Sequence, residues 1–427
     1  MSILYIAHGH PRFARGGGEL AAYRLFDAIR QQSGYEKSGL LAAAPNASIL
    51  PAGCQIMGLQ PHEWLIAPSH HALVHDSAIK LTKDAHGVVF NALKTYPFQL
   101  IHAHHYVHIG IDLLIAIKTW FPSSRLILTL HEYWAMCAYE GRLLRRNGKF
   151  CNGPSPMDCL DCVGHQHRQA LAVRRLRIRH LFEKVDCFIS PSYFLKERYV
   201  DWGLSPDRIH VIENLPHDLS PSFNKTNSQL LPSDDSKIVF AYFGQANPWK
   251  GIDQIIKSFL EIHSYYPSAL LHINGLSQEM LHSSESHLEP MFAERCADLL
   301  DLAPQGSVVL RGPYEEDELI ARMSDANVVV MASRWYENAP MVIQEAFSHA
   351  TPVIAPRLGG MEEKIQHRQN GLLFDPFSST GLADAMRWCM ANLQHLNAMR
   401  EHASASALKT EQVLSDHLSL YQSLSAE

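Results

Sequence analysis

The stretch SRWYENAPMVIQEA, residues 333–346, follows a short apolar run at 328–331 and carries two carboxylates eight positions apart. The apolar run predicts a buried strand, and Pro340 is typical of the first turn of a helix. Glu337 then lies in the loop between strand and helix, and Glu345 lies about one and a half turns into the helix. The pattern predicts two carboxylates around a helix start, where they could address two points of one extended ligand.

The helix start itself is the second part of this prediction. Backbone amides at Met341 and Val342 would point out of the helix N-terminus, where a diphosphate group is favoured. The spacing of Glu337 and Glu345 alone fits equally well with two solvated glutamates around an ordinary buried helix.

The same rhythm of short apolar runs and longer amphipathic stretches extends over most of the chain. Strands alternating with helices indicate parallel sheets covered on both faces, an α/β fold. The expected strands are 3–7, 40–44, 99–103, 125–130, 187–190, 210–213, 238–243, 270–274, 308–311, 328–331, 352–355 and 372–374.

Composition narrows the class of protein. The 427 residues are 46% hydrophobic and 19% charged, an ordinary globular balance that excludes disorder and coiled coil. The formal charge of −6 argues against a general nucleic-acid binder. No apolar run reaches the length of a membrane span, and residues 1–7 resemble a first strand more than a signal peptide. We therefore expect a cytoplasmic protein.

A change of composition divides the chain. Residues 216–236 are rich in Pro, Ser and Asp and lack periodicity, as expected for a linker. We expect an N-terminal domain over 1–216, a linker over 217–236, a C-terminal domain over 237–400 and a helical tail over 401–427. Two open α/β domains joined in this way predict a cleft between the carboxyl ends of the two sheets.

Two glycine-bearing loops follow expected strands. Gly17 and Gly18, in the run GGGE at 16–19, would let a helix start approach a phosphate or sugar, although a flexible loop fits as well. Lys250, in GQANPWKG at 244–251, could neutralise a diphosphate, although most lysines are simply solvated. The chain has no dinucleotide fingerprint of the Gly-x-Gly-x-x-Gly type and no P-loop, which argues against dehydrogenases and P-loop enzymes.

Together with TPVIA at 351–355, GGMEE at 359–363 and NGLLF at 370–374, the segment 333–346 resembles the donor half of family 4 retaining glycosyltransferases of the GT-B fold. The loops at 16–19 and 249–251 fit the same family in order and spacing, as does VIEN at 211–214. The resemblance covers roughly residues 1 to 390. It implies two Rossmann-like domains facing each other across a cleft, with acceptor binding in the first and nucleotide-sugar binding in the second.

The resemblance also implies roles for single residues. Glu345 would bind the ribose hydroxyls, Glu337 would face the donor sugar, and Lys250 would bind the diphosphate. His131 would meet the transferred sugar near the reacting centre. The catalytic set is Glu337, His131 and Lys250, and the donor-binding set is Gly17, Gly18, Gly244, Gln245, Lys250, Arg311, Arg334, Asn338, Ala339, Pro340, Met341, Val342, Glu345, Gly359 and Gly360.

One position departs from the family pattern. An Arg usually precedes the diphosphate-binding Lys by several positions, and here Gln245 and Asn247 occupy that loop. Arg334 or Arg311 could replace this phosphate contact. The loop at 311–314 lies where the family holds the nucleobase.

The implied reaction is transfer of a sugar, with retention of anomeric configuration, to a glycan or a lipid-linked glycan in cell-surface polysaccharide synthesis. The chain contains no Asp-x-Asp pair, so we expect Lys and helix-dipole stabilisation of the leaving diphosphate and no catalytic metal. One alternative is a nucleotide-sugar epimerase or hydrolase on the same fold. Another is a non-catalytic subunit that binds nucleotide or sugar.

Four cysteines fall within an insertion at about 132–165: Cys137, Cys151, Cys159 and Cys162. Cys159 and Cys162 form a Cys-x2-Cys pair, and four thiolates would satisfy one tetrahedral structural zinc. Two disulfides or four free thiols are the alternatives. Many relatives with the same resemblance carry a similar Cys-rich segment after the His.

Basic residues crowd the predicted helix over 168–184. They are Arg168, Arg174, Arg175, Arg177, Arg179 and Lys184. A solvated helix face accounts for such a run, and so does peripheral contact with an anionic membrane or a diphosphate-linked lipid acceptor.

Overall fold

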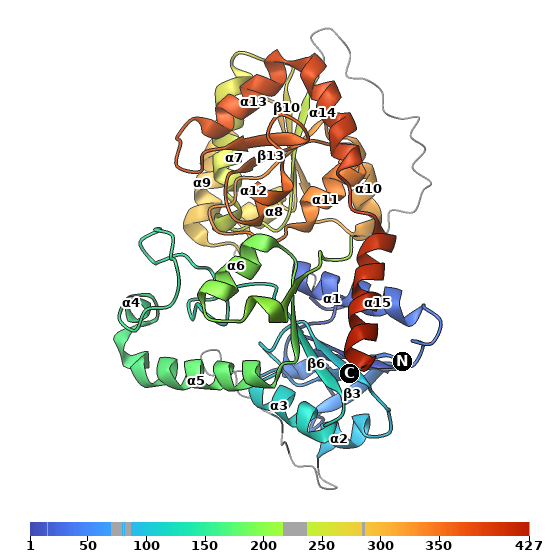
Figure 1. The fold of residues 1–427 in the computed structure, drawn as a ribbon. Coiled ribbons are helices and arrows are strands. Elements are labelled where there is room, and N and C mark those ends of the chain that lie inside the picture. The colour runs from blue at the N-terminus through green and yellow to red at the C-terminus, as the bar shows by residue number, and fades with distance from the viewer. Residues whose placement is uncertain are drawn as a thin grey trace. The chain divides into compact units, whose positions relative to one another are not determined.

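The computed structural model describes residues 1–14, 16–69, 79, 81, 87–216, 237–283 and 287–426. The chain forms two compact units, shown in Figure 1. The first comprises Met1–Leu215 and Thr410–Glu427, and the second Pro216–Lys409. The linker expected over 217–236 lies outside the described residues.

The first unit is built on an eight-stranded sheet with the strand order β3-β4-β2-β1-β5-β6-β7-β8. All neighbours are parallel except β3 and β4, which are antiparallel. The strands are β1 Ile3–Ala7, β2 Gly39–Ala43, β3 Ile56–Gln60, β4 Glu63–Ile66, β5 Leu100–Ala103, β6 Arg125–Thr129, β7 Cys187–Ser190 and β8 Ile209–Val211. The helices are α1 Gly17–Arg30, α2 Val88–Leu93, α3 Ile111–Trp120, α4 Asp158–Val163, α5 Arg168–Lys184, α6 Tyr193–Asp201 and α15 Thr410–Ala426.

The edge hairpin of this sheet was missed by the sequence analysis, which predicted neither β3 nor β4. The residues of β3 are half-buried or exposed, so the strand lacks the apolar run that marks the inner strands. By contrast, every residue of β1 and β2 is buried, as expected for parallel strands covered on both faces. The strands with apolar runs could therefore be predicted, including the edge strands β8, β11 and β14, whereas the β3–β4 hairpin could not.

The last helix of the chain, α15, belongs to the first unit and not to the unit that precedes it in sequence. Its Tyr421 hydroxyl lies 2.7 Å from His102 Nδ1 and accepts a hydrogen bond from the Tyr5 hydroxyl at 3.3 Å. His102 and Tyr5 lie on β5 and β1, so α15 is fastened to the middle of the sheet. The sequence analysis treated this segment only as a helical tail.

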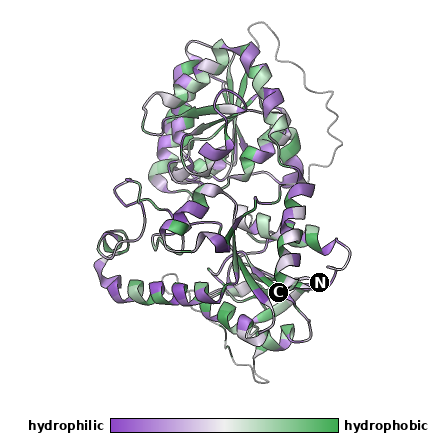
Figure 2. Cartoon of the chain, in the orientation of Figure 1, coloured by the Kyte–Doolittle hydropathy of each residue, from purple (hydrophilic) through white to green (hydrophobic). Residues whose placement is uncertain are grey.

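The second unit is built on six parallel strands in the order β11-β10-β9-β12-β13-β14. The strands are β9 Val239–Phe243, β10 Leu270–Asn274, β11 Val308–Gly312, β12 Val328–Val330, β13 Val353–Pro356 and β14 Gly371–Phe374. The helices are α7 Ile252–His263, α8 Gln278–His282, α9 Pro290–Asp301, α10 Glu316–Ser324, α11 Met341–Ser348, α12 Gly360–Lys364, α13 Gly381–Ala391 and α14 Leu393–Ala405. Phe240, Phe259 and Phe292 are fully buried in its core, and Figure 2 shows the hydrophobic strands between helices with polar outer faces.

Both sheets reverse their strand order at one point. In the first unit the reversal lies between β1 and β5, and in the second between β9 and β12. Loops that leave the carboxyl ends of neighbouring strands diverge at such a point and form the binding crevice of open α/β sheets. The residues that follow these four strands are therefore the candidates for a functional site.

Candidate functional site

The loop after β9 holds Lys250 in a defined position. The side-chain oxygen of Asn247 accepts hydrogen bonds from the Trp249 and Lys250 amides at 3.0 and 3.1 Å, which caps the short 3-10 turn Pro248–Lys250. Gly251 then turns with φ of 70°, and a Cβ there would lie 2.1 Å from the Ala332 carbonyl oxygen. Only glycine fits this turn, which fastens the Lys250 loop against the residues that follow β12.

Lys250 is paired with Glu337, which comes from the loop after β12. Lys250 Nζ donates to Glu337 Oε1 at 2.6 Å, and Ser333 Oγ and Trp335 Nε1 donate to the same oxygen at 2.8 and 2.7 Å. Glu337 is only 8% exposed. Burial acts to raise its pKa, but the charge of Lys250 and the three hydrogen bonds outweigh burial and hold the pKa below its usual value. Glu337 is therefore a fixed, ionised carboxylate, and its Oε2 takes no part in these three bonds.

The glycine pair after β13 packs directly on this loop. The Gly360 amide donates to the Glu337 carbonyl at 2.7 Å, and a Cβ on Gly360 would lie 1.6 Å from the Asn338 carbonyl oxygen. Gly359 has φ of 60°, in the left-handed region. The two glycines thus bring the start of α12 against residues 337 and 338 with no side chain between them.

The helix that follows is α11, which begins at Met341. The sequence analysis placed Pro340 in the first turn of the helix. In the structure Pro340 has an extended ψ of 116° and is the residue immediately before the helix. The amides of Met341 and Val342 occupy the first two positions of the helix. The start of α11 follows Glu337 by four residues, so the loop and the helix N-terminus form one continuous segment.

Glu345 lies further along α11 and is 9% exposed. Burial and the nearby Glu345 carboxylate both raise the pKa of Tyr314. Tyr314 follows β11 and packs edge-on against Phe243 with ring centroids 5.8 Å apart. The Glu345 carboxylate and the loop at 311–314 are therefore neighbours, as the implied ribose and nucleobase contacts would require.

The two arginines considered as phosphate ligands are already engaged. Arg334 Nη2 donates to Asp253 Oδ2 at 3.1 Å and Nη1 to the Pro248 carbonyl at 3.4 Å, so this side chain braces the Lys250 loop. Arg311 Nη1 donates to Asp325 Oδ2 at 2.8 Å. In this state each guanidinium already has a carboxylate partner within the unit.

The first unit gathers histidines at its own reversal point. His8 Nε2 lies 3.0 Å from Glu19 Oε1, and the rings of His8 and His105 are 4.6 Å apart. A Cβ on Gly18 would lie 3.0 Å from His8 Cε1, so the start of α1 also closes on this ring. Of these residues, the sequence analysis singled out only Gly18. The run HAHH at 102–105, at the end of an apolar strand, is a sequence signal that could have indicated a polar cluster.

Two further pairs extend this cluster. His104 Nδ1 and His131 Nε2 share a hydrogen bond of 2.9 Å, and His105 Nε2 lies 3.0 Å from Glu132 Oε1. His105 Nδ1 accepts hydrogen bonds from two backbone amides, those of Tyr106 and Val107. In the neutral ring its proton must then be on Nε2, which donates to Glu132.

Burial controls the charges of this cluster. It lowers the pKa of His131 to about 3 and sets the pKa values of His104 and His105 well below the usual range. It raises the pKa of Glu132 to about 8, against a hydrogen bond from the Trp134 amide. His131 is therefore a neutral imidazole at physiological pH.

The four cysteines of the insertion are all described as free thiols. They surround one small cavity of about 20 Å³. Within the described residues, no three or more His, Cys, Asp or Glu side chains already stand in a metal-binding arrangement.

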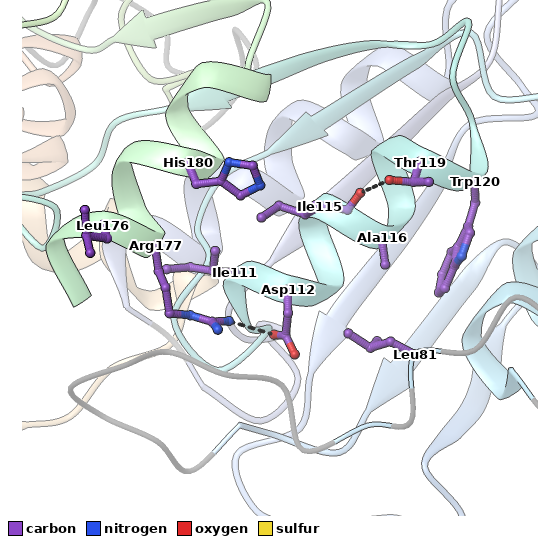
Figure 3. Close-up of a pocket in the computed structure, with 10 residues that line it drawn as sticks. All are labelled: Leu81, Ile111, Asp112, Ile115, Ala116, Thr119, Trp120, Leu176, Arg177 and His180. Carbon is purple, nitrogen blue, oxygen red and sulfur yellow. Dashed lines mark hydrogen bonds and ion pairs between the residues drawn. The ribbon is translucent and has the colours of Figure 1, made fainter. Parts of the chain in front are cut away.

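The basic helix α5 presents a mixed face. Its Arg174 is buried, while Val173 and Leu176 are 45% and 69% exposed. Figure 3 shows Leu176, Arg177 and His180 beside residues of α3 around a groove of about 630 Å³. No helix in the described part of the chain has the length and apolarity that crossing a bilayer requires.

Comparisons with known proteins agree with this architecture. Residues 223–406 match the model of glycosyl transferases group 1, and residues 40–215 match that of glycosyltransferase family 4. A D-inositol 3-phosphate glycosyltransferase of Nocardioides sp. is 28% identical over 333 residues, 74% of this chain and 64% of the relative. The chain thus spans less than two thirds of the first relatives it matches.

Solved structures share the fold over the full length. Sucrose-phosphate synthase from Thermosynechococcus elongatus superposes with a TM-score of 0.68 at 18% identity, covering all of both chains. HepE of Anabaena, in complex with UDP, superposes with a TM-score of 0.66 at 19% identity, covering 99% of this chain and all of HepE. The doubly wound sheets, the two family matches and these neighbours lead to one conclusion: the chain belongs to the family 4 glycosyltransferases and has the GT-B fold.

Proposed function

We propose that the second unit binds a nucleoside-diphosphate sugar at its strand-order reversal and that the protein transfers the sugar to an acceptor. The observation that carries this proposal is the Lys250–Glu337 ion pair, held at 2.6 Å by loops from β9 and β12. A buried carboxylate fixed by three donors, next to a helix N-terminus, is arranged to orient one polar ligand and to attract an anion.

The roles follow from the charges. Lys250 and the first amides of α11 neutralise the diphosphate, including the charge that develops as the bond to the sugar breaks. Glu337 orients the donor sugar, and Glu345 binds the ribose beside the loop at 311–314. Gly244, Gln245, Gly359 and Gly360 line the loops around the diphosphate. This scheme stabilises the leaving group through protein dipoles and Lys250, without a catalytic metal.

Transfer would retain the anomeric configuration, in keeping with the resemblance to retaining enzymes. HepE was solved with UDP, which supports a nucleotide as the donor's leaving group. The acceptor would be a glycan or a lipid-linked glycan in cell-surface polysaccharide synthesis. His131, a neutral hydrogen-bonding group, would contact the transferred sugar and would not act as a charged acid.

Helix α5 supports a peripheral contact with an anionic surface. Its exposed residues include Val173 and Leu176 among Arg175, Arg179 and Lys184, the mixture that interfacial helices use. Such a contact would bring the protein to lipid-linked acceptors.

The proposal is tested with purified protein, a panel of nucleoside-diphosphate sugars and an extract of lipid-linked and free glycans. We expect release of nucleoside diphosphate to need both one donor and the extract, and the product to keep the donor's anomeric configuration by NMR. Free sugar without extract would indicate a hydrolase, and a new nucleotide sugar an epimerase. Binding without any turnover would indicate a non-catalytic subunit.

A further inference from the structure

The insertion after β6 brings together four cysteines that are up to 25 positions apart in sequence. Cys137, Cys151, Cys159 and Cys162 line the same cavity, which has a volume of about 20 Å³. That volume holds roughly one water-sized particle. The cysteines of Cys-x2-Cys lie on α4, a helix of six residues, and the other two lie on the irregular chain before it.

The insertion has little regular secondary structure. Between β6 and α5 that structure consists of α4, a 3-10 turn at His165–His167 and a single bridge between Leu144 and Phe150. Buried leucines such as Leu143 and Leu160 and the Arg145–Asp158 ion pair hold it in part. Three residues of the cluster are half-buried and Cys137 is buried, and a metal would add a crosslink to this irregular segment.

Backbone groups already point at the sulfurs. The Ser155 amide donates to Cys159 Sγ at 3.3 Å. In the protonated state Cys137 Sγ donates to the Tyr139 carbonyl at 3.5 Å, and Cys151 Sγ to the Gly153 carbonyl at 3.2 Å. Those two bonds depend on the thiol protons and end when the sulfurs ionise.

A buried cation lies beside the cluster. Arg174 on α5 is 4% exposed, and its Nη1 donates to the Ala135 carbonyl at 3.2 Å. Its Nε and Nη2 have no hydrogen-bond partner among the residues that the structure describes. Arg174 lies within electrostatic range of Cys159 and of the Glu132 carboxyl. A buried guanidinium favours nearby negative charge. Burial raises the pKa of Glu132 to about 8, so this carboxyl is mostly neutral near pH 7 and zinc-bound thiolates would add negative charge beside Arg174.

We propose that Cys137, Cys151, Cys159 and Cys162 bind one structural zinc ion and that Arg174 neutralises part of the charge of the site. Binding of Zn²⁺ to four thiols releases four protons and leaves a centre of charge −2, with no change of oxidation state. The sulfurs turn from the carbonyls toward the cavity by rotation about the Cα–Cβ bond. The zinc centre would then join the start of the insertion, at Cys137, to its end, at Cys159 and Cys162 on α4. This inference does not depend on the proposed function.

The first test is metal analysis of the full chain purified without chelator. We expect about one zinc ion per chain. A zinc content of about one half per chain or less would contradict the proposal. Replacing zinc by cobalt should produce the intense thiolate-to-cobalt absorption of a four-sulfur site. Cys159→Ser and Cys162→Ser should lose the metal, whereas Cys54→Ser, which removes an exposed cysteine outside the insertion, should keep it.

The alternatives have distinct signatures. Two disulfides would leave the four cysteines unreactive to alkylation until reduction and would lower the intact mass by four hydrogen atoms. Four free thiols would alkylate in the native protein with no metal bound. Iron in place of zinc, with visible absorption as purified, would indicate a cluster. Each of these results would overturn the proposal.

The role of Arg174 has its own matched pair of variants. Arg174→Met should speed the loss of zinc to a chelator severalfold, because the anionic centre loses its buried counter-charge. Arg175→Met, which changes the exposed neighbour on the same helix, should leave the rate unchanged. Equal rates in the two variants would contradict the charge argument, while zinc content would still decide the site itself.

Discussion

The two sheets of this protein reverse their strand order at equivalent places, but different chemistry gathers at each. Beside β9 and β12, one ionised carboxylate is fixed by Lys250, Ser333 and Trp335. Beside β1 and β5, imidazoles stack and bond with one another and with Glu19 and Glu132, and burial keeps His104, His105 and His131 neutral. The topology therefore determines where a site forms, and the loop residues determine what it binds.

The difference suggests that the two sites bind chemically different groups. The charged site in the second unit suits a diphosphate, whose binding requires a fixed cation and helix dipole. The neutral imidazoles of His104, His105 and His131 in the first unit suit hydroxyl groups, which hydrogen-bond to uncharged donors and acceptors. The following experiments would break or sharpen this contrast.

The largest effect is expected from Glu337→Gln. The amide keeps the volume but removes the charge that holds Lys250, so sugar transfer should fall about 100-fold or more. Nucleoside-diphosphate affinity should change less than about tenfold, because the diphosphate is held by Lys250 and α11. Glu261→Gln, an exposed glutamate of the same unit, is the control. Turnover within about threefold of the wild type would remove Glu337 from the reaction.

A large loss of stability is expected from Gly251→Ala. Gly251 and Gly306 have similar backbone angles, with φ of 70° and 78°, but a Cβ meets Ala332 O at 2.1 Å only at position 251. Both substitutions incur the left-handed strain, and Gly251→Ala adds a clash of about 1–3 kcal/mol. Urea unfolding of the two variants measures this difference. Equal destabilisation would show that the Lys250 loop is not clamped against the end of β12.

A smaller, pH-dependent effect is expected from Glu132→Gln. Burial raises the pKa of Glu132 from 4.5 to about 8 in the folded protein, so the folded state holds this proton more tightly than the unfolded state. Stability from this group is complete below about pH 4.5 and is lost as the pH rises toward 8. His131 acts oppositely, because its pKa falls from 6.5 to about 3 and its contribution grows up to pH 6.5.

The clearest window for Glu132 is therefore pH 6.5 to 8, where the wild type should lose melting temperature relative to Glu132→Gln. Glu197→Gln, an exposed control in the same unit, should follow the wild type. Parallel curves for all three proteins would show that Glu132 is ionised throughout.

The smallest effect concerns α5. Reversing two exposed charges with Arg175→Glu and Arg179→Glu should weaken cosedimentation with vesicles containing anionic lipid. Each basic residue near such a surface contributes about 1 kcal/mol, and salt screens it. Lys257→Glu, which reverses one exposed charge in the second unit, is the control and should be compared with each single reversal on α5. Wild-type protein that binds anionic and neutral vesicles equally would leave α5 as a solvated helix.

How much was predictable differs between the two sites. The site residues of segment 333–346 could be predicted because the two carboxylates, Pro340 and the start of the helix follow one another in sequence. The pairing of Glu337 with Lys250, 87 positions away, depends on the adjacency of β9 and β12, which no local pattern contains. The histidine cluster joins four separate segments, and each of its residues resembles an ordinary buried histidine when considered alone.

For the fold, too, only features with a local sequence pattern could be predicted. Fully buried strands such as β1 carry unbroken apolar runs and were predicted at their observed bounds. The half-exposed β3 carries no such run. The placement of α15 in the first unit rests on Tyr421 reaching His102, 319 positions away, so it could not be predicted from helix periodicity.

The central claim is that the second unit binds a nucleoside diphosphate through Lys250. The most direct measurement is thermal unfolding of wild type, Lys250→Met and Lys257→Met with UDP, GDP and ADP, in EDTA and in magnesium. We expect one nucleotide at 100 times its dissociation constant to stabilise wild type and Lys257→Met by about 2.7 kcal/mol in both buffers. Lys250→Met should lose most of that shift. No shift for any nucleotide, a shift only in magnesium, or a full shift in Lys250→Met would contradict the account.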